Sequence, residues 1–419
     1  MEAISFNRRF QTRAGAGLKH AFRSLKYRNY RLFFMGQAVS LIGIWMQQVA
    51  VSWLAYRLTG SAILLGIVVF CAQIPVFFLA PLTGTLGDRW SRRNMLFGTQ
   101  MLFMLQAFIL FLLTVTKIIA PWHMIALSLA QGIINSFEMP TRQAFIMDII
   151  DDKKDLPNAI ALNSAVFNSS RLIGPAIAGI VVAIAGEAVC FAVNSMTYLA
   201  SLLALLLMRF VSEQNHSGKR FLDDMYEGFR YVRRNRLVRD LLAVVAFASF
   251  FTMMFPVLLP IFAREVLMGD SHTFGFLVSA VGSGALAATM FLAIRTGIEG
   301  LGGIINFCIF SLATAFMLLA APPLLFTAII LLALAGFSTI VIIASCNTII
   351  QTVSESDKRG RVLSFYVMAF TGGAPLGSLV AGYVSDRLGA PLTFFYAGLA
   401  CLIAGILIFF RRRGKRNWA

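Results

Sequence analysis

Long apolar stretches alternate with short polar segments along nearly the whole chain. Each stretch reaches about 20 residues, the length at which a helix crosses the hydrocarbon core of a membrane. A β-barrel would instead show segments of about ten residues with alternating polarity, and that pattern is absent. We therefore expect an all-α membrane protein with twelve spans, at residues 32–56, 62–86, 94–116, 122–147, 159–185, 188–209, 240–263, 272–294, 301–320, 323–351, 362–385 and 391–410.

One spaced set of residues occurs twice, once in each half of the chain. Gly174, Gly179, Gly186 and Phe191 recur with the same spacing as Gly377, Gly382, Gly389 and Phe394. A period near half the chain length is far too long for a solenoid, whose repeats have a few tens of residues. We expect two pseudo-symmetric six-helix bundles, at residues 32–210 and 240–411. Transporters built of such repeats bind substrate between them and rock one against the other.

The distribution of charged residues predicts how the two bundles are oriented across the membrane. Only 13% of the residues are charged, against about 25% in a soluble domain. The net charge of +17 comes from Lys and Arg in alternate loops and at both termini. By the positive-inside rule, both termini and the loop between the bundles are cytoplasmic. No basic and aromatic recognition module accompanies this charge, so we expect no nucleic-acid partner.

Three basic or polar segments flank the bundles. In residues 1–31, Leu18, Phe22 and Leu25 share one face of a helix that we expect to lie on the inner leaflet. Residues 211–239 form a cytoplasmic linker, either with an interfacial helix or as a solvated connector. Residues 412–419 form a basic cytoplasmic tail.

Motifs of soluble enzymes and metal sites are missing. The five cysteines show no CxxC spacing and the four histidines are scattered, which indicates neither a disulfide framework nor a metal site. No nucleotide-binding glycine pattern or hydrolase motif occurs. We therefore expect no enzyme activity and no cofactor.

The loop between spans two and three reads Gly84-Thr-Leu-Gly-Asp88-Arg89-Trp-Ser91-Arg92-Arg93. It resembles the signature loop of the major facilitator superfamily, with Ser91 in place of the usual glycine. The resemblance implies a cytoplasmic gate of Asp88, Arg89 and Arg92, in which Arg92 pairs with an acid at a span end, for which Asp148 is the candidate. The alternative is a plain anchor at the inner leaflet.

The fifth span contains Ser170-Arg171-Leu-Ile-Gly174-Pro175-Ala-Ile-Ala178-Gly179. This segment is similar to the signature of proton-linked antiporters of the same superfamily, with Ser170 and Ala178 in place of two glycines. The similarity implies export driven by a proton gradient, with Gly174 and Pro175 part of the gating machinery. Close packing against another span would explain the same residues.

Polar residues form a stripe on the fourth span and continue on its neighbours. A charge within the bilayer costs at least roughly 2.5–3.5 kcal/mol on insertion scales, so Glu138, Arg142 and Arg171 should face a wet cavity or one another. They either line the translocation path or lock the first bundle. Glu138 is our first candidate for a proton carrier and Asp148 the second. The candidate path consists of Gln37, Gln47, Gln131, Asn135, Glu138, Arg142, Asn168 and Arg171.

Further segments resemble the enterobactin-exporter-like group of bacterial secretion carriers. They are Arg28-Asn-Tyr-Arg31, Pro140-Thr-Arg142-Gln-Ala144, Leu156-Pro-Asn-Ala-Ile-Ala-Leu-Asn163 and Gly360-Arg-Val-Leu-Ser364. The resemblance implies efflux of a siderophore or amphipathic drug across a bacterial inner membrane, and we expect a monomer. One departure is Ser128, where related antiporters often have Arg. The alternatives are a lipid, lysolipid or multidrug transporter, and a sensor or assembly partner that does not transport.

Overall fold

The computed structural model describes residues 22–87, 91–209, 229–295, 297–321, 324–355 and 358–413, which contain helices and no strands. A 3-10 turn, η1 (Arg23–Lys26), precedes the first half, and a second one, η2 (Lys153–Asp155), lies within it. The α-helices of this half are α2 (Arg28–Thr59), α3 (Ala62–Gly87), α4 (Arg92–Val115), α5 (Pro121–Asp148), α6 (Leu156–Ala185) and α7 (Glu187–Leu207).

The second half repeats this plan, with a broken first span. Its helices are α9 (Arg236–Thr252), α10 (Phe255–Ile261), the π-helical turn η3 (Phe262–Val266), α11 (Ser271–Ile294), α12 (Leu301–Leu319), α13 (Leu325–Val353) and α14 (Arg359–Arg413). Pro256 and Pro260 explain the break, because a proline inside a helix removes one backbone hydrogen bond and clashes with the preceding turn. The sequence predicted one unbroken span, 240–263, at this place.

The twelve predicted spans are confirmed in the described residues. Ten helical segments there are long and apolar enough to cross a membrane. The helix α14 accounts for two spans, since its backbone leaves the helical region at Gly389. The helix α5 is long enough but is not among the ten, and its polar stripe is the physical reason.

Equivalent residues of the duplication adopt equivalent conformations. Gly186 has φ 82° and ψ 171° at the turn between α6 and α7, and Gly389 has φ 78° and ψ 164° within α14. Positive φ at this point favours glycine, which lacks a Cβ. Phe191 and Phe394, which follow these turns, are fully buried.

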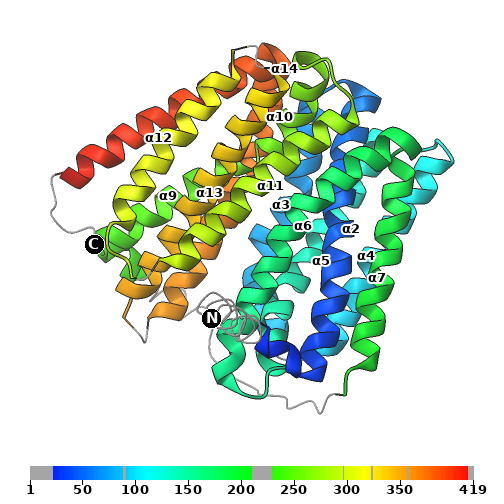
Figure 1. Cartoon of the computed structure of the whole chain (residues 1–419), viewed down its shortest axis with the longest axis horizontal. Helices are drawn as coiled ribbons and strands as arrows, with labels where there is room; N and C mark the ends of the chain where they lie inside the picture. The colour runs from blue at the N-terminus through cyan, green and yellow to red at the C-terminus, as the bar shows by residue number, and fades with distance from the viewer. Residues whose placement is uncertain are drawn as a thin grey trace, which may run out of the picture.

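The two halves meet at one end of the molecule and diverge toward the other (Figure 1). We call the end that carries η1, η2 and the start of α14 the terminal end, and the other one the opposite end. The helix α5 packs on α2, α3, α4 and α6 of its own half, and α13 packs on α9, α11, α12 and α14 of its own half. In Figure 1 the ribbons of the two bundles are most separate at the terminal end.

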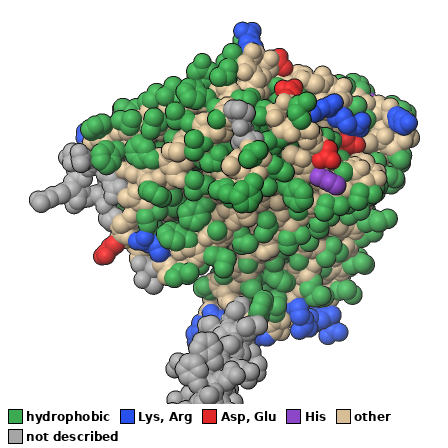
Figure 2. All heavy atoms as spheres, turned by 45° about the horizontal axis from the view of Figure 1, so that its top comes forward, with side chains coloured by type: hydrophobic (Ala, Val, Ile, Leu, Met, Phe, Trp, Pro, Cys, Tyr) green, Lys and Arg blue, Asp and Glu red, His purple; other side chains and the backbone are tan. Residues whose placement is uncertain are grey.

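The outer surface is that of a membrane protein. Hydrophobic side chains cover most of the face seen in Figure 2, and charged side chains gather near its margins. Large apolar side chains such as Phe78, Ile184 and Phe307 are more than half exposed, as expected of a surface that faces lipid. The predicted inner-leaflet helix, the first part of the linker and the basic tail fall largely outside the described residues, although residues 229–234 are helical.

Candidate functional site

Glycines bring the two halves into backbone contact along two helix pairs. The helix α6 packs on α11, and α3 packs on α14. A Cβ atom at Gly179 would lie 2.8 Å from the carbonyl oxygen of Ser271, and one at Gly382 would lie 2.7 Å from that of Ala62. Because Gly179 and Gly382 are duplicates, the two contacts are related by the pseudo-symmetry. Gly179 faces Gly275, and Gly382 faces Gly66.

At the opposite end, side chains close the junction between the halves. The Tyr56 hydroxyl donates a hydrogen bond to Glu265 Oε1. The rings of Trp53 and Phe274 stack nearby, with centroids 5.9 Å apart. The Ser271 hydroxyl donates to the Gly179 carbonyl over 3.3 Å. We call the contacts of Tyr56 with Glu265 and of Trp53 with Phe274 the seal, because they close the junction between the halves at the opposite end.

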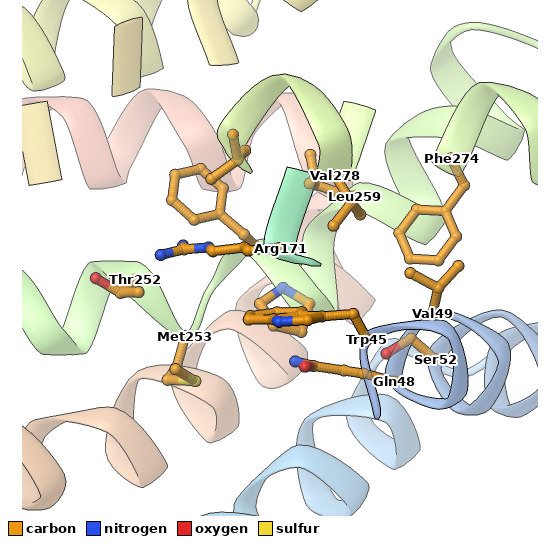
Figure 3. A pocket seen from close by; sticks show the side chains of 13 residues that line it. Trp45, Gln48, Val49, Ser52, Arg171, Thr252, Met253, Leu259, Phe274 and Val278 are labelled. Atoms are coloured by element: carbon orange, nitrogen blue, oxygen red, sulfur yellow. The ribbon is translucent and has the colours of Figure 1, made fainter. Parts of the chain in front are cut away.

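Below this seal lies a cavity between the halves (Figure 3). The space within it that a water-sized molecule can reach is about 70 Å³, and the wider hollow, including its opening to solvent, is about 550 Å³. The first half lines it with Trp45, Gln48, Val49 and Ser52 of α2 and Arg171 of α6; the second half contributes Thr252, Met253, Phe255, Pro256, Leu259, Phe274, Val278 and Val281.

Arg171 is the charged residue of this cavity. Its guanidinium carbon lies 5.7 Å from the centroid of the Trp45 ring, a cation–π distance. Within the described part of the chain, Arg171 has no carboxylate at ion-pair distance. The indole nitrogen of Trp45 is buried, with no hydrogen-bond partner among those residues. The site therefore offers a positive charge that no described acid balances.

Glu138 and Arg142 lie elsewhere, paired with each other. Arg142 Nε is 3.4 Å from Glu138 Oε1, and both side chains are largely buried. Arg142 also donates to Gln37 Oε1 over 3.3 Å. The structure therefore brings Gln37, Glu138 and Arg142 together, whereas Arg171 packs on Trp45.

Gln47 belongs to a buried polar chain inside the first half. Its amide nitrogen donates to Gln106 Oε1 over 3.0 Å, and Asn194 donates to its oxygen over 2.8 Å. These hydrogen bonds link α2 to α4 and α7, so Gln47 does not line the cavity described above. Its neighbour Gln48 does.

The other predicted path residues are partly buried on α5 and α6. Gln131 and Asn135 lie on α5, and the Asn168 amide donates to the Ser164 carbonyl of its own helix over 2.9 Å. None of the three lines the cavity between the halves. They stay predictions as substrate contacts.

The ion pair expected between Arg92 and Asp148 is present. Arg92 Nη1 lies 2.6 Å from Asp148 Oδ1, which joins the start of α4 to the end of α5 at the terminal end. Asp88 and Arg89 lie outside the described residues. Gly174 lets α6 approach Trp45 of α2, and the Pro175 carbonyl lies where α6 meets Gly275 of α11.

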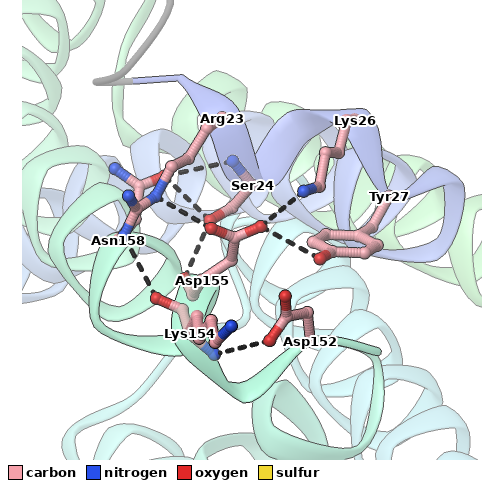
Figure 4. A network of polar contacts seen from close by, with 8 residues as sticks. All are labelled: Arg23, Ser24, Lys26, Tyr27, Asp152, Lys154, Asp155 and Asn158. Atoms are coloured by element: carbon pink, nitrogen blue, oxygen red, sulfur yellow. Dashed lines mark hydrogen bonds and ion pairs between the residues drawn. The ribbon is translucent and has the colours of Figure 1, made fainter.

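A second polar cluster fixes the segment before α2 to the start of α6 (Figure 4). Asp155 lies 2.9 Å from Arg23 and 2.7 Å from Lys26, and it accepts a hydrogen bond from Tyr27. The Tyr30 hydroxyl donates to the Ala159 carbonyl over 2.8 Å. The hydrogen bond between Tyr30 and Ala159 joins two of the segments that resemble the exporter group, Arg28–Arg31 and Leu156–Asn163.

Trp45, Gln48 and Ser52 were not among the predicted site residues. They follow at steps of three and four, so they share one face of α2. The sequence carries this signal, but α2 has a second polar face, with Gln37, Ser40 and Gln47. Only packing shows which face turns toward the other half.

Characterised relatives align over most of the chain. The Staphyloferrin A transporter of Staphylococcus aureus is 26% identical, and the alignment covers 91% of this chain and 96% of that protein. The multidrug efflux pump Tap of Mycolicibacterium fortuitum is 24% identical, with 87% and 91% covered. The macrolide efflux protein A of Streptococcus pyogenes is 20% identical, with 91% and 96% covered. These relatives are named as transporters, not enzymes.

Solved transporter structures share the fold. The nucleoside transporter NupG superposes with a TM-score of 0.71 at 14% identity, over 92% of this chain and 98% of that one. A bacterial homologue of the human lysosomal transporter Spinster gives a TM-score of 0.66 at 14% identity, over 92% and 97%.

The family model described as transmembrane secretion effector (MFS_3) matches residues 19–417. The predicted resemblance to siderophore and drug exporters is thereby confirmed, and so is the fold of two six-helix bundles. The chain belongs to the transmembrane secretion effector family of major facilitator transporters, and is a multi-pass membrane transporter.

Proposed function

We propose that this protein exports a siderophore or another amphipathic organic compound across a bacterial inner membrane, by proton-coupled alternating access. The main observation behind this proposal is the cavity between the two halves. Both halves line it, and a carrier that rocks its halves must hold the substrate between them. The relatives named as a Staphyloferrin A transporter and as multidrug and macrolide efflux proteins support a substrate of this class.

The distribution of basic residues gives the proposed transporter an orientation across the membrane. The positive-inside rule makes the terminal end cytoplasmic, with both termini inside. The seal of Tyr56, Trp53, Phe274 and Glu265 then lies on the outer side. This arrangement corresponds to a state in which an exporter loads its substrate from the cytoplasm. In the outward-open state, Asp88, Arg89, Arg92 and Asp148 would latch the cytoplasmic ends.

Glu138 is the proposed proton carrier. It is buried and its partner Arg142 also holds Gln37, so protonation of Glu138 would remove the charge that balances Arg142. A change in protonation that alters contacts differently in two states can shift their populations. Asp148 is the second candidate, since its pairing with Arg92 ties two helix ends together. We propose that the protein works as a monomer, because the cavity lies between the two halves of a single chain.

The apolar lining of the second half favours one alternative, a multidrug or lysolipid transporter. Met253, Phe255 and Leu259 would suit a ligand without a polar head as well as the body of an amphiphile. A sensor or assembly partner that does not transport finds no comparable support.

A transport assay in proteoliposomes separates these functions. Vesicles with the purified protein receive radiolabelled staphyloferrin A, a macrolide or a fluorescent lysolipid, with and without an imposed pH gradient. We expect accumulation of the siderophore or the macrolide that requires the gradient and is absent from protein-free vesicles. Gradient-independent movement of lysolipid alone would favour the lipid transporter, and no movement of any probe would exclude transport of these compounds.

A further inference from the structure

We propose that the cavity between the halves selects amphipathic organic anions, with the acidic head at Arg171 of the first half and the apolar body against the second half. This inference rests on the proposed function, because it defines the substrate class of that same cavity. It concerns affinity and charge preference, which are measured separately from gradient-driven transport.

The two walls of the cavity differ in chemistry. The first half contributes a guanidinium, an indole, an amide and a hydroxyl, with Val49 as its aliphatic side chain. Seven of the eight lining residues of the second half are apolar, and Thr252 is the exception. A ligand that contacts both walls satisfies them best with one polar end and one apolar end.

The charge of Arg171 decides the sign of the polar end. An unpaired charge that is removed from water is costly unless a partner compensates it. Among the described acids, Glu138 pairs with Arg142 and Glu265 accepts a hydrogen bond from Tyr56. A carboxylate on the ligand would supply the missing partner, and the planar guanidinium can bind it through two parallel hydrogen bonds.

The Trp45 ring supports this geometry. It lies beside the Arg171 side chain in Figure 3, and the cation–π contact fixes the guanidinium against α2. Gly174 permits this approach, because a Cβ atom there would lie 2.6 Å from the Cβ of Trp45. The arginine is thus held by an aromatic ring, which leaves its hydrogen-bond donors free for a ligand.

Three water-soluble probes with the same body test the proposal. They are 1-naphthaleneacetate, its neutral amide and 1-naphthylmethylammonium, and binding is measured by titration calorimetry at pH 7 with the protein in lipid nanodiscs. The wild-type protein should bind the acetate at least tenfold more tightly than the ammonium compound. Equal binding of all three, or binding of none, would overturn the proposed substrate class.

Four variants test where the acidic head and the apolar body of the ligand bind. Arg171→Gln should weaken acetate binding at least tenfold and amide binding less than threefold, and Arg171→Lys should fall between Arg171→Gln and the wild type. Leu259→Ala should weaken all three probes by a similar factor. Thr314→Val, at an exposed position of α12 outside the cavity, is the control and should leave the affinity for all three probes unchanged.

The result that overturns the assignment is an equal loss for all three probes in both Arg171 variants. Arg171 would then only hold the bundle together. Gradient-driven transport by the wild-type protein would be unaffected by that result, so the proposed export function would stand.

Discussion

Tyr56 at the end of α2 donates a hydrogen bond to Glu265 in η3, which joins the first half to the second at the end opposite the termini. The break of the seventh span makes this contact possible. The prolines of α10 end the regular helix, and the π-helical turn that follows carries Glu265. A π-helical turn within a helix frequently marks a functional position.

Loss of this hydrogen bond should favour opening of the opposite end. We predict that Tyr56→Phe raises the alkylation rate of a cysteine at Ser52, in the cavity, about fivefold or more with a membrane-impermeant maleimide added at the opposite end. The reason is that a hydrogen bond to a charged group contributes about 1.5–3 kcal/mol. Tyr383→Phe, at an exposed tyrosine of α14, is the control. The same alkylation rate in both variants would contradict a gating role for Tyr56.

The glycine contacts between the halves predict a second effect. Gly179→Ala and Gly382→Ala each place a Cβ within 2.8 Å of a carbonyl oxygen of the other half, so the helix pairs must move apart. We expect each variant to lose at least half of the transport rate in proteoliposomes. Gly98→Ala is the matched control, since a Cβ there meets nothing within 4 Å. Wild-type rates in the Gly179 and Gly382 variants would show that the close approach is not needed for transport.

Glu138 should be needed for coupling rather than for binding. Glu138→Gln removes the acid that balances the largely buried Arg142, and loss of one partner of a buried pair costs about 3–5 kcal/mol. We predict lower thermal stability, nearly complete loss of transport driven by a pH gradient, and substrate affinity within a few-fold of the wild type.

The double variant Glu138→Gln with Arg142→Gln separates stability from coupling. It should recover most of the thermal stability, because no unbalanced charge remains, and still fail to couple transport to the gradient. If the single variant transports fully with the gradient, the proton carrier is another group, and Asp148 becomes the candidate.

Asp155 should hold the N-terminal segment against α6. Asp155→Asn weakens its contacts with Arg23, Lys26 and Tyr27, so we expect a lower melting temperature and faster proteolysis near residue 27. The exposed Asp151→Asn is the control. Unchanged proteolysis in Asp155→Asn would show that the remaining contacts suffice.

The same cluster predicts the direction of a pH effect. The hydrogen bond to Asp155 raises the pKa of Lys26 above its usual 10.5. The stability that this pair contributes is therefore complete below the unfolded pKa and is lost as the pH rises through the higher folded pKa. Lys26 stays protonated between pH 6 and pH 9, so its contact with Asp155 should not alter the proteolysis rate near residue 27 in that range. Proteolysis there should become faster through loss of this contact only in strongly alkaline solution.

Helix number, helix type and the duplication could be predicted from the sequence, because span length and glycine spacing are local properties. The positive φ of both Gly186 and Gly389 is a direct result of that duplication. The pairing of Arg92 with Asp148 was also predictable, since charges at span ends need partners.

The rotation of each helix about its axis was not predictable. Gln47 and Gln48 are adjacent, yet one binds Gln106 and Asn194 inside the bundle and the other lines the cavity. The stripe that groups Arg171 with Glu138 and Arg142 likewise divides into two sites, because Arg142 meets α2 at Gln37 whereas Arg171 meets the same helix at Trp45, about two turns away. Which side chains of a helix face the cavity and which face the bundle interior depends on packing between segments that are distant in the sequence.

The central claim is that the two halves rock about the glycine contacts, so that one end opens as the other closes. Pulsed electron spin resonance can measure this with two spin-label pairs at exposed positions in nanodiscs: Leu58 with Met268 at the opposite end, and Met147 with Val353 at the terminal end. On addition of substrate and a shift from pH 8 to pH 5.5, we predict that the first distance distribution moves to longer values and the second to shorter values. If both distances stay constant, or change in the same direction, the protein does not work by alternating access about this interface.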